Sequence, residues 1–192
     1  MPARGRRGAG ETALSTEEQL AHLRERREAL VREHMESENV HDFDTTIATF
    51  HHPRYELIAT GEVYDGEAAV REYFAQTRRA FPDQRNELIA LRHSDDAVIV
   101  EFFLLGTHLG PLRSLPATGR AFRCRMTAYF IFEGERLVAE RVYFDQATIL
   151  SQLGLAHDPR SWRGRVTLLL SHPLTLGRAL LGAARERGAP SG

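Results

Sequence analysis

An aspartate stands at the end of an apolar segment, in the stretch "RVYFDQATILSQLG" over residues 141–154. A carboxylate among apolar neighbours has a raised pKa, so it can accept and return a proton near neutral pH. Such a group can remove a proton from a carbon next to a carbonyl. Aspartate is also among the best helix N-caps. Residue type and spacing alone favour a cap for Asp145, and one residue can serve both purposes.

A histidine on another predicted strand is a candidate helper. His108 shares one strand face with four apolar residues, Val98, Val100, Phe102 and Leu104. With an unperturbed pKa near 6.5, its imidazole can carry a proton or polarise a carbonyl. The alternative is a buried histidine that bonds to loop backbone and holds residues 106–120 in shape. Both interpretations stay open.

Motifs for other chemistries are missing from the sequence. There is no His-Glu-x-x-His, no pair of cysteines, no glycine-rich phosphate loop and no Gly-x-Ser-x-Gly elbow. We therefore expect no metal site. Cys124 is the single cysteine, so no intrachain disulfide can form, and inert packing is its expected role. Without a secretory leader pattern, a cytoplasmic location is expected.

Charge and hydropathy narrow the possible partners. Residues 1–14 hold three arginines and one glutamate, and residues 160–192 hold six arginines and one glutamate. Since the total charge is −1, the middle of the chain carries −8. An acidic body argues against nucleic-acid binding. No run approaches the roughly 20 apolar residues of a membrane span, so no integral membrane association is expected.

The elements that must position these residues follow an α+β order. A capping box at Ser15 and Glu18 predicts a helix to about Ser37. A short helix capped by Asp42 or Asp44 follows, then a strand over 54–60 and a third helix, over about 69–77, that stops near 81–83. Strands are predicted over 86–93, 96–108, 120–132 and 136–144, before a short helix over 146–153. Helices followed by an antiparallel meander predict a curved sheet with helices on one face.

The ends of the chain are expected to be extensions of one domain over residues 15–155. Residues 1–14 predict a disordered basic tail. Residues 156–192 predict an extension with an amphipathic helix after Pro173. Its apolar stripe is Leu174, Leu180, Leu181 and Ala184. This helix would dock on its own subunit or on a dimer mate, and attachment to a membrane surface is the alternative.

Three strings resemble a known family. They are "YDGEAAVREYFAQTRRAFPD" (64–83), "GTHLGPLRSLPATGR" (106–120) and "VYFDQATILSQLGL" (142–155). In this order they resemble the SnoaL-like polyketide cyclase (ester cyclase) branch of the NTF2-like superfamily, from about Glu28 to Leu155. The chain departs from the branch at Ala117, where a second proline is common, and it lacks a tryptophan in the last strand. These departures leave the substrate open.

The resemblance implies a cone-shaped α+β barrel in which three helices close a strongly bent, mainly antiparallel sheet around an apolar pocket. It implies intramolecular aldol ring closure on a polyketide-type ester, a small hydrophobic carbonyl compound, without metal or organic cofactor. Asp145 matches the family's acid/base, and His108 would help it. It also implies a homodimer formed by sheet packing. The expected pocket-lining residues are Phe50, Phe74, Phe102, Met126, Phe130 and Tyr143.

Other functions fit the same cone. An isomerase needs similar acid/base groups, whereas an epoxide hydrolase needs an arginine between two aspartates, for which Arg123 or Arg125 is the candidate. A non-catalytic module that binds a small hydrophobic ligand is the third possibility. A catalytic role for Asp145 in any of these reactions depends on which face of the strand points into the cone. By strand alternation, Asp145 falls on the face of Leu137, Ala139, Arg141 and Tyr143. If the other face is the inner one, Asp145 points inward only where the strand ends or bulges.

Overall fold

The helices at the N-terminal side begin where the local sequence predicts. The computed structural model describes residues 15–158 and 160–179, so the predicted tail and Leu180, Leu181 and Ala184 lie outside the described residues. Helix α1 (Thr16–Asn39) starts at the capping box of Ser15 and Glu18, in which each side chain bonds the other residue's backbone N–H. Asp42 caps helix α2 (Phe43–Ala48), and helix α3 spans Glu67–Ala80.

Six strands form one curved sheet. They are β1 (Arg54–Leu57), β2 (Glu62–Asp65), β3 (Arg85–His93), β4 (Ala97–Thr107), β5 (Ala121–Glu133) and β6 (Arg136–Phe144). The order across the sheet is β2-β1-β6-β5-β4-β3, and β1 pairs parallel to β6 while the other pairs are antiparallel. The prediction of one strand over 54–60 missed β2, because Gly61 turns the chain back with a φ of 72°.

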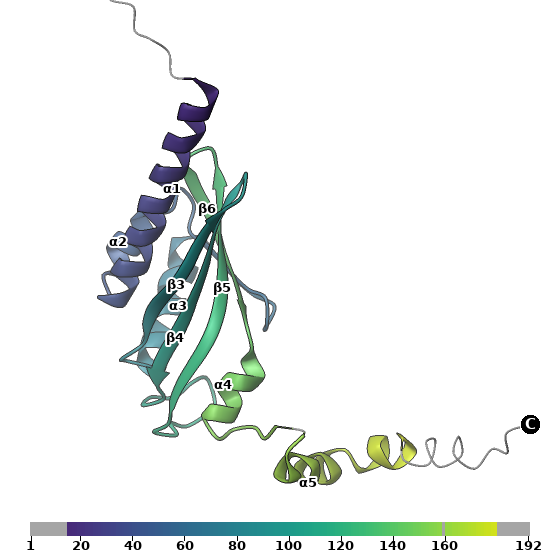
Figure 1. Cartoon of the computed structure of the whole chain (residues 1–192). Coiled ribbons are helices and arrows are strands. Elements are labelled where there is room, and N and C mark those ends of the chain that lie inside the picture. Colours follow the sequence, from purple (N-terminus) through teal and green to yellow (C-terminus); the bar gives the residue numbers. More distant parts are fainter. Residues whose placement is uncertain (1–14, 159, 180–192) are drawn as a thin grey trace, which may run out of the picture.

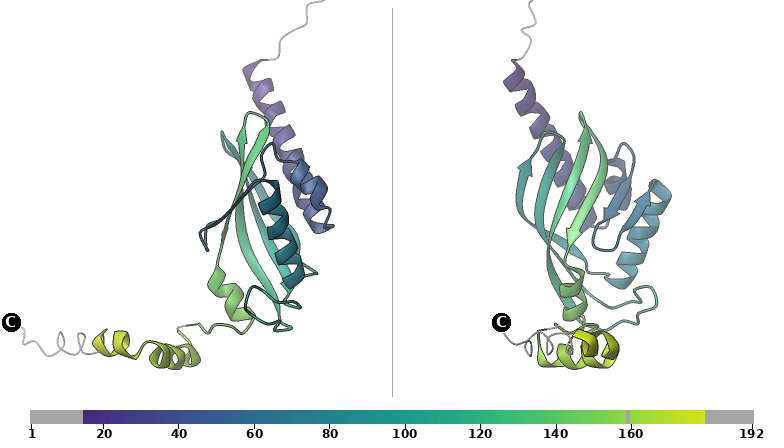
Figure 2. Two further views of the ribbon diagram at one scale, coloured as in Figure 1. Left: turned by 180° about the vertical axis from the view of Figure 1, so that it is seen from behind. Right: turned by 90° about the vertical axis from the view of Figure 1, so that its right-hand side faces the viewer.

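The helices cover one face of the sheet. In Figure 1, α1, α2 and α3 lie along the same side of the long strands, and Figure 2 shows the same layering from behind. Strand β5 alternates as predicted, with an apolar row buried beneath the helices and its arginines on the other face. The α+β class with helices on a bent sheet is therefore confirmed.

The chain beyond β6 leaves the body of the molecule. Helix α4 (Gln146–Gln152) packs at the end of β5, and α5 (Trp162–Ser171) extends away from the sheet (Figure 1). The sequence pattern predicted a helix after Pro173 but not α5. Residues 173–179 are helical as well. In the described part of the chain, no helix combines the length and hydrophobicity needed to cross a membrane.

Candidate functional site

A cavity of about 460 Å³ lies between the covered face of the sheet and the helices. Its walls are mostly aromatic and aliphatic, and they come from β1, α3, β4, β5, β6 and α4. Polar groups gather at one part of the lining, where Glu38, Tyr55 and Glu140 meet. An apolar chamber with a few converging polar groups is the usual form of a small-molecule site.

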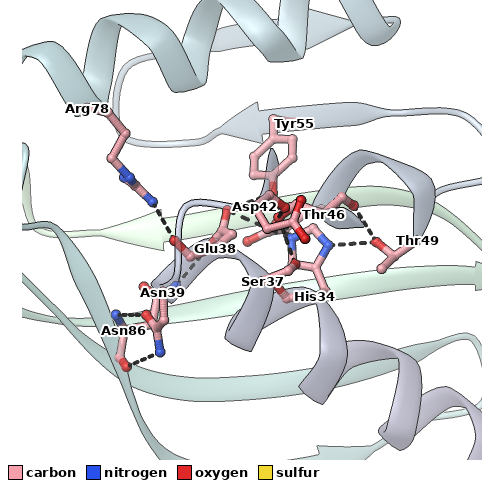
Figure 3. A network of polar contacts seen from close by, with 11 residues as sticks. His34, Ser37, Glu38, Asn39, Asp42, Thr46, Thr49, Tyr55, Arg78 and Asn86 are labelled. Atoms are coloured by element: carbon pink, nitrogen blue, oxygen red, sulfur yellow. Dashed lines mark hydrogen bonds and ion pairs between the residues drawn. The ribbon is translucent and has the colours of Figure 1, made fainter. Parts of the chain in front are cut away.

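His34 lies directly behind these polar groups, on the buried face of α1. Its side chain is completely buried, and the rings of Phe50 and Phe130 stand edge-on to the imidazole, each with a centroid separation of 5.2 Å. Nδ1 lies 2.8 Å from the hydroxyl of Thr49, and Nε2 lies 2.7 Å from the hydroxyl of Tyr55 (Figure 3). Both ring nitrogens are therefore held in place.

The hydrogen-bond directions around His34 assign its protons. Thr49 donates its hydroxyl hydrogen to the carbonyl of Thr46 at 2.7 Å, so it accepts from Nδ1. Tyr55 donates to Oε1 of Glu38 at 3.0 Å, because a carboxylate can only accept, so Tyr55 in turn accepts from Nε2. An imidazole that donates through both nitrogens is an imidazolium. The network therefore favours a positively charged His34.

Glu140 supplies the nearest negative charge. Its Oε2 lies 3.3 Å from Nε2 of His34, and its side chain is almost completely buried on the cavity wall. Oε2 has the distance of an ion pair with His34 but makes no hydrogen bond of good geometry with any described residue. This buried carboxylate oxygen therefore lies beside His34 with hydrogen-bonding capacity that no described residue uses.

Burial and pairing shift the pKa values of both His34 and Glu140. Burial would lower the pKa of His34, but its close pairing with Glu140 and the charge of Glu38 raise that pKa overall. Burial raises the pKa of Glu140 above its ordinary value, although its close pairing with His34 opposes the shift. A carboxylate with a raised pKa is a stronger base than an ordinary glutamate, which suits proton transfer from carbon.

Among the described residues, His34, Glu38 and Glu140 form the one group of three side chains that could hold a metal ion. The donor atoms of His34, Glu38 and Glu140 lie within 4.8 Å of one another. A metal would need a deprotonated Nε2 aimed at it. Here Nε2 is engaged with Tyr55, and the proton directions place a hydrogen on it. The present arrangement therefore fits a proton on Nε2 of His34 better than a metal ion bound to it.

Asp145 occupies a different environment from the one predicted for an acid/base. It is the N-cap of α4, accepting from the backbone N–H of Thr148 at 3.1 Å and from its hydroxyl at 2.6 Å. The side chain is exposed and does not line the cavity. The hydrogen bonds from Thr148 lower the pKa of this carboxyl, which weakens it as a base. This geometry matches the capping interpretation, while its acid/base role stays a prediction.

His108 is completely buried but does not line the cavity either. Its Nδ1 accepts from the backbone N–H of Thr118 at 3.3 Å, and its backbone bonds Arg120 and Gly119. These contacts join the two ends of the 106–120 loop. The structure therefore places His108 where the loop-holding interpretation requires it.

The predicted lining residues divide into three groups. Phe74, Phe102 and Met126 line the cavity, whereas Phe50 and Phe130 pack around His34 without lining it. Tyr143 is exposed on the opposite face of the sheet, against Tyr129. The inward prediction for Tyr143 was wrong because Val142 and Phe144, its neighbours in the strand, face the cavity.

The arginines considered for an epoxide hydrolase also lie on the outer face. Arg123 pairs with Glu87, and Arg125 pairs with Glu101. The side chains of Arg123 and Arg125 are 50% and 62% exposed. Neither lines the cavity, so neither can stand between two carboxylates there.

Sequence reasoning missed the polar cluster itself. Neither His34 nor Glu140 was among the predicted site residues. A histidine on the buried stripe of a helix and an acid on the face of Val142 and Phe144 were the available signals. Neither signal shows that the two residues meet.

Comparisons with known proteins agree with this architecture. The profile of the SnoaL-like polyketide cyclase family matches residues 28–153. No curated protein matches the chain significantly.

Several solved structures share the fold. A Xanthomonas campestris protein assigned as a polyketide cyclase is 18% identical, with a TM-score of 0.62 over 68% of this chain and 98% of its own. IdmH from Streptomyces antibioticus, likewise assigned as a polyketide cyclase, is 23% identical, with a TM-score of 0.58 over 67% and 98%. A Catenulispora acidiphila protein with a ketosteroid isomerase-like fold is 17% identical, with a TM-score of 0.56 over 66% and 92%.

Proposed function

The chain belongs to the SnoaL-like polyketide cyclase family, and from this membership we propose that it closes a ring in a hydrophobic polyketide-type carbonyl compound by acid/base catalysis. Glu140 is the proton acceptor in this proposal, and His34 is its charged partner. The substrate would occupy the apolar cavity, and side chains alone would carry out the proton transfers.

One observation carries the proposal: the buried carboxyl of Glu140 stands on the cavity wall with an oxygen free of hydrogen bonds among the described residues. A buried, unsatisfied carboxylate oxygen is costly for stability unless a ligand uses it. His34 keeps this carboxylate in place at 3.3 Å, and the raised pKa of Glu140 makes proton uptake favourable. The arrangement suits a base that works in an apolar chamber.

The reaction needs no external reagent. Glu140 takes a proton from the carbon next to a carbonyl, and the enolate carbon attacks a second carbonyl of the same molecule. A carbon–carbon bond forms, the attacked carbonyl becomes an alkoxide, and the proton held by Glu140 returns to that oxygen. If the proton returns to another carbon instead, the same groups perform an isomerisation. A non-catalytic binding protein would not remove the proton from the carbon next to the carbonyl.

Proton exchange on a model ketone tests the base directly. We expect the protein to accelerate exchange of the α-protons of 2-tetralone in D₂O, measured by NMR. Glu140→Gln keeps the size of the side chain but cannot accept the proton, so the enhancement should fall by roughly 10²-fold or more, the usual contribution of a general base.

Asp145→Asn is the matched control, because it neutralises the carboxylate that the family resemblance favours while leaving the cavity wall intact. We expect it to retain the exchange rate within about threefold, less than one positioned base contributes. Loss of exchange in Asp145→Asn with retention in Glu140→Gln would assign the base to Asp145. No exchange with the wild-type protein would favour a binding module. Circular dichroism would verify that each variant is folded.

A further inference from the structure

Arg78 on α3 is a cation on the cavity wall for which no described residue supplies a counter-ion. Its Nε and Nη1 are buried and make no hydrogen bond with any described residue. The remaining nitrogen, Nη2, reaches only the backbone carbonyl of Glu38, at 3.4 Å (Figure 3). The guanidinium lies over the ring of Phe43, 5.2 Å from its centroid. Two buried donors thus lack an acceptor.

The carboxylates of the cavity are engaged elsewhere. Glu38 accepts from Tyr55 at 3.0 Å and, through its other oxygen, from the side-chain amide of Asn86 at 2.8 Å. Glu140 lies against His34, and Glu62, the third carboxylate of the lining, pairs with Arg113. No carboxylate of the described residues approaches Arg78 within ion-pair distance, although most other buried charges in proteins are paired.

Other donors on the same lining lack partners too. The hydroxyl of Tyr73 and the side-chain amide of Gln84 line the cavity and form no side-chain hydrogen bond within the described chain. Burial raises the pKa of the Tyr73 phenol, which therefore stays a neutral donor. Guanidinium, phenol and amide together favour an acceptor with several oxygen lone pairs. The guanidinium fork in particular matches the two oxygens of a carboxylate.

The rest of the chamber favours an apolar skeleton with rings. Besides Tyr73, the lining contains the aromatic residues Tyr55, Tyr64, Phe74, Phe81, Phe102, Phe122 and Phe144. Aromatic walls bind flat, ring-containing molecules through stacked and edge-on contacts. A ligand suited to this cavity therefore combines an apolar ring system with one negatively charged oxygen group.

We propose that the cavity binds an apolar, ring-containing carboxylic acid and that Arg78 binds its carboxylate. This deepens the proposed function by naming the substrate class, a free acid in place of an ester. The binding proposal rests on the proposed function in one respect only: both assume that the ligand of this cavity is also the substrate. Binding through Arg78 and proton transfer at Glu140 are separable, since they use different side chains.

Calorimetry with three matched probes tests the inference on the full-length protein. They are 2-naphthoate, 2-naphthamide and methyl 2-naphthoate, which share one ring system and differ in the charge of one substituent. We expect the acid to bind at least about tenfold more tightly than either neutral probe, as for a hydrogen-bonded charge pair. Arg78→Met retains the length of the side chain and should abolish this preference.

Arg79→Met is the matched control, because Arg79 is the next residue of α3, is exposed and lines no part of the cavity. It removes the same charge and should leave the preference for the acid unchanged. Equal binding of the three probes, no binding of the acid, or full retention of the preference in Arg78→Met would each overturn the proposal. Glu140→Gln should still bind the acid, so failure of the catalytic proposal is distinguished from failure of this one.

Discussion

His34 and Glu140 form a charged pair inside an apolar body, and neither residue is one at which the sequence indicated chemistry. Removing one partner of such a pair is strongly destabilising because it leaves an unpaired buried charge. The imidazole donates hydrogen bonds to the hydroxyls of Thr49 and Tyr55, so the geometry of the pair is fixed before a ligand enters. Fixed geometry is what a base needs to act without reorganisation.

The raised pKa of His34 makes stability depend on pH. The folded protein keeps a proton on His34 at pH values where the unfolded chain, with a pKa of about 6.5, has released it. The free energy of unfolding should therefore fall as the pH rises from about 6.5 through the folded pKa of His34, by up to about 1.4 kcal/mol per pH unit. Urea unfolding between pH 6 and 8.5 measures this slope.

His34→Gln removes the titrating group and should flatten the slope, besides lowering stability. His22→Gln, at an exposed position of the same helix, should leave the slope unchanged. The raised pKa of Glu140 acts in the same direction at lower pH, since its protonated form is also favoured by folding. A slope that is equal in wild type and His34→Gln would contradict the imidazolium assignment.

Among the elements, helix α4 depends on Asp145, which is its N-cap. Asp145 bonds two groups of Thr148 in the first turn of this seven-residue helix. Such a short helix has little stability of its own and relies on its cap and its packing. The cap also fixes where the chain leaves β6, and α4 contributes Ile149 and Leu150 to the cavity lining.

Asp145→Ala should lower the free energy of unfolding by about 1 kcal/mol through loss of the cap, whereas Asp145→Asn, which can still cap, should cost much less. Thermal unfolding followed by circular dichroism compares the two. Equal stability of Asp145→Ala and wild type would show that the capping bonds contribute nothing measurable.

For the whole molecule, the outer face of the sheet is the expected site of self-association. This face exposes Tyr129 and Tyr143 in contact with each other, surrounded by pairs of arginine and glutamate. The resemblance to NTF2-like proteins implies a homodimer formed by sheet packing. An exposed aromatic pair with a charged surround fits the centre and rim of an interface.

Native mass spectrometry should therefore detect a dimer of the full chain. The double variant Tyr129→Arg and Tyr143→Arg places like charges on the expected interface and should shift the protein to monomer. Trp162→Arg, at an exposed position on α5, serves as control and should remain dimeric. A wild-type monomer at micromolar concentration would refute the prediction, and dissociation of the Trp162→Arg variant would move the interface to the C-terminal extension.

The sequence by itself determined the local elements. The capping box of Ser15 and Glu18, the cap at Asp42, the alternation of β5 and the turns between the long strands are set by residues close in the chain, so their patterns predict them. The resemblance of three sequence stretches to one family also predicted the family of the chain and its bent α+β sheet.

Only the tertiary structure decided the site, because its members come from distant segments. His34 and Glu140 are brought together by the packing of α1 on β6. A register shift leaves Val138 unpaired near the start of β6, so Leu137 and Glu140 are both buried although they differ in parity, and Asp145 keeps the outward side. A bulge of one residue reverses which side chains face inward, and no local pattern shows where it falls. Parity sets Glu140 on the face of Val142 and Phe144 and Asp145 on the other face, but it does not show which face the helices cover.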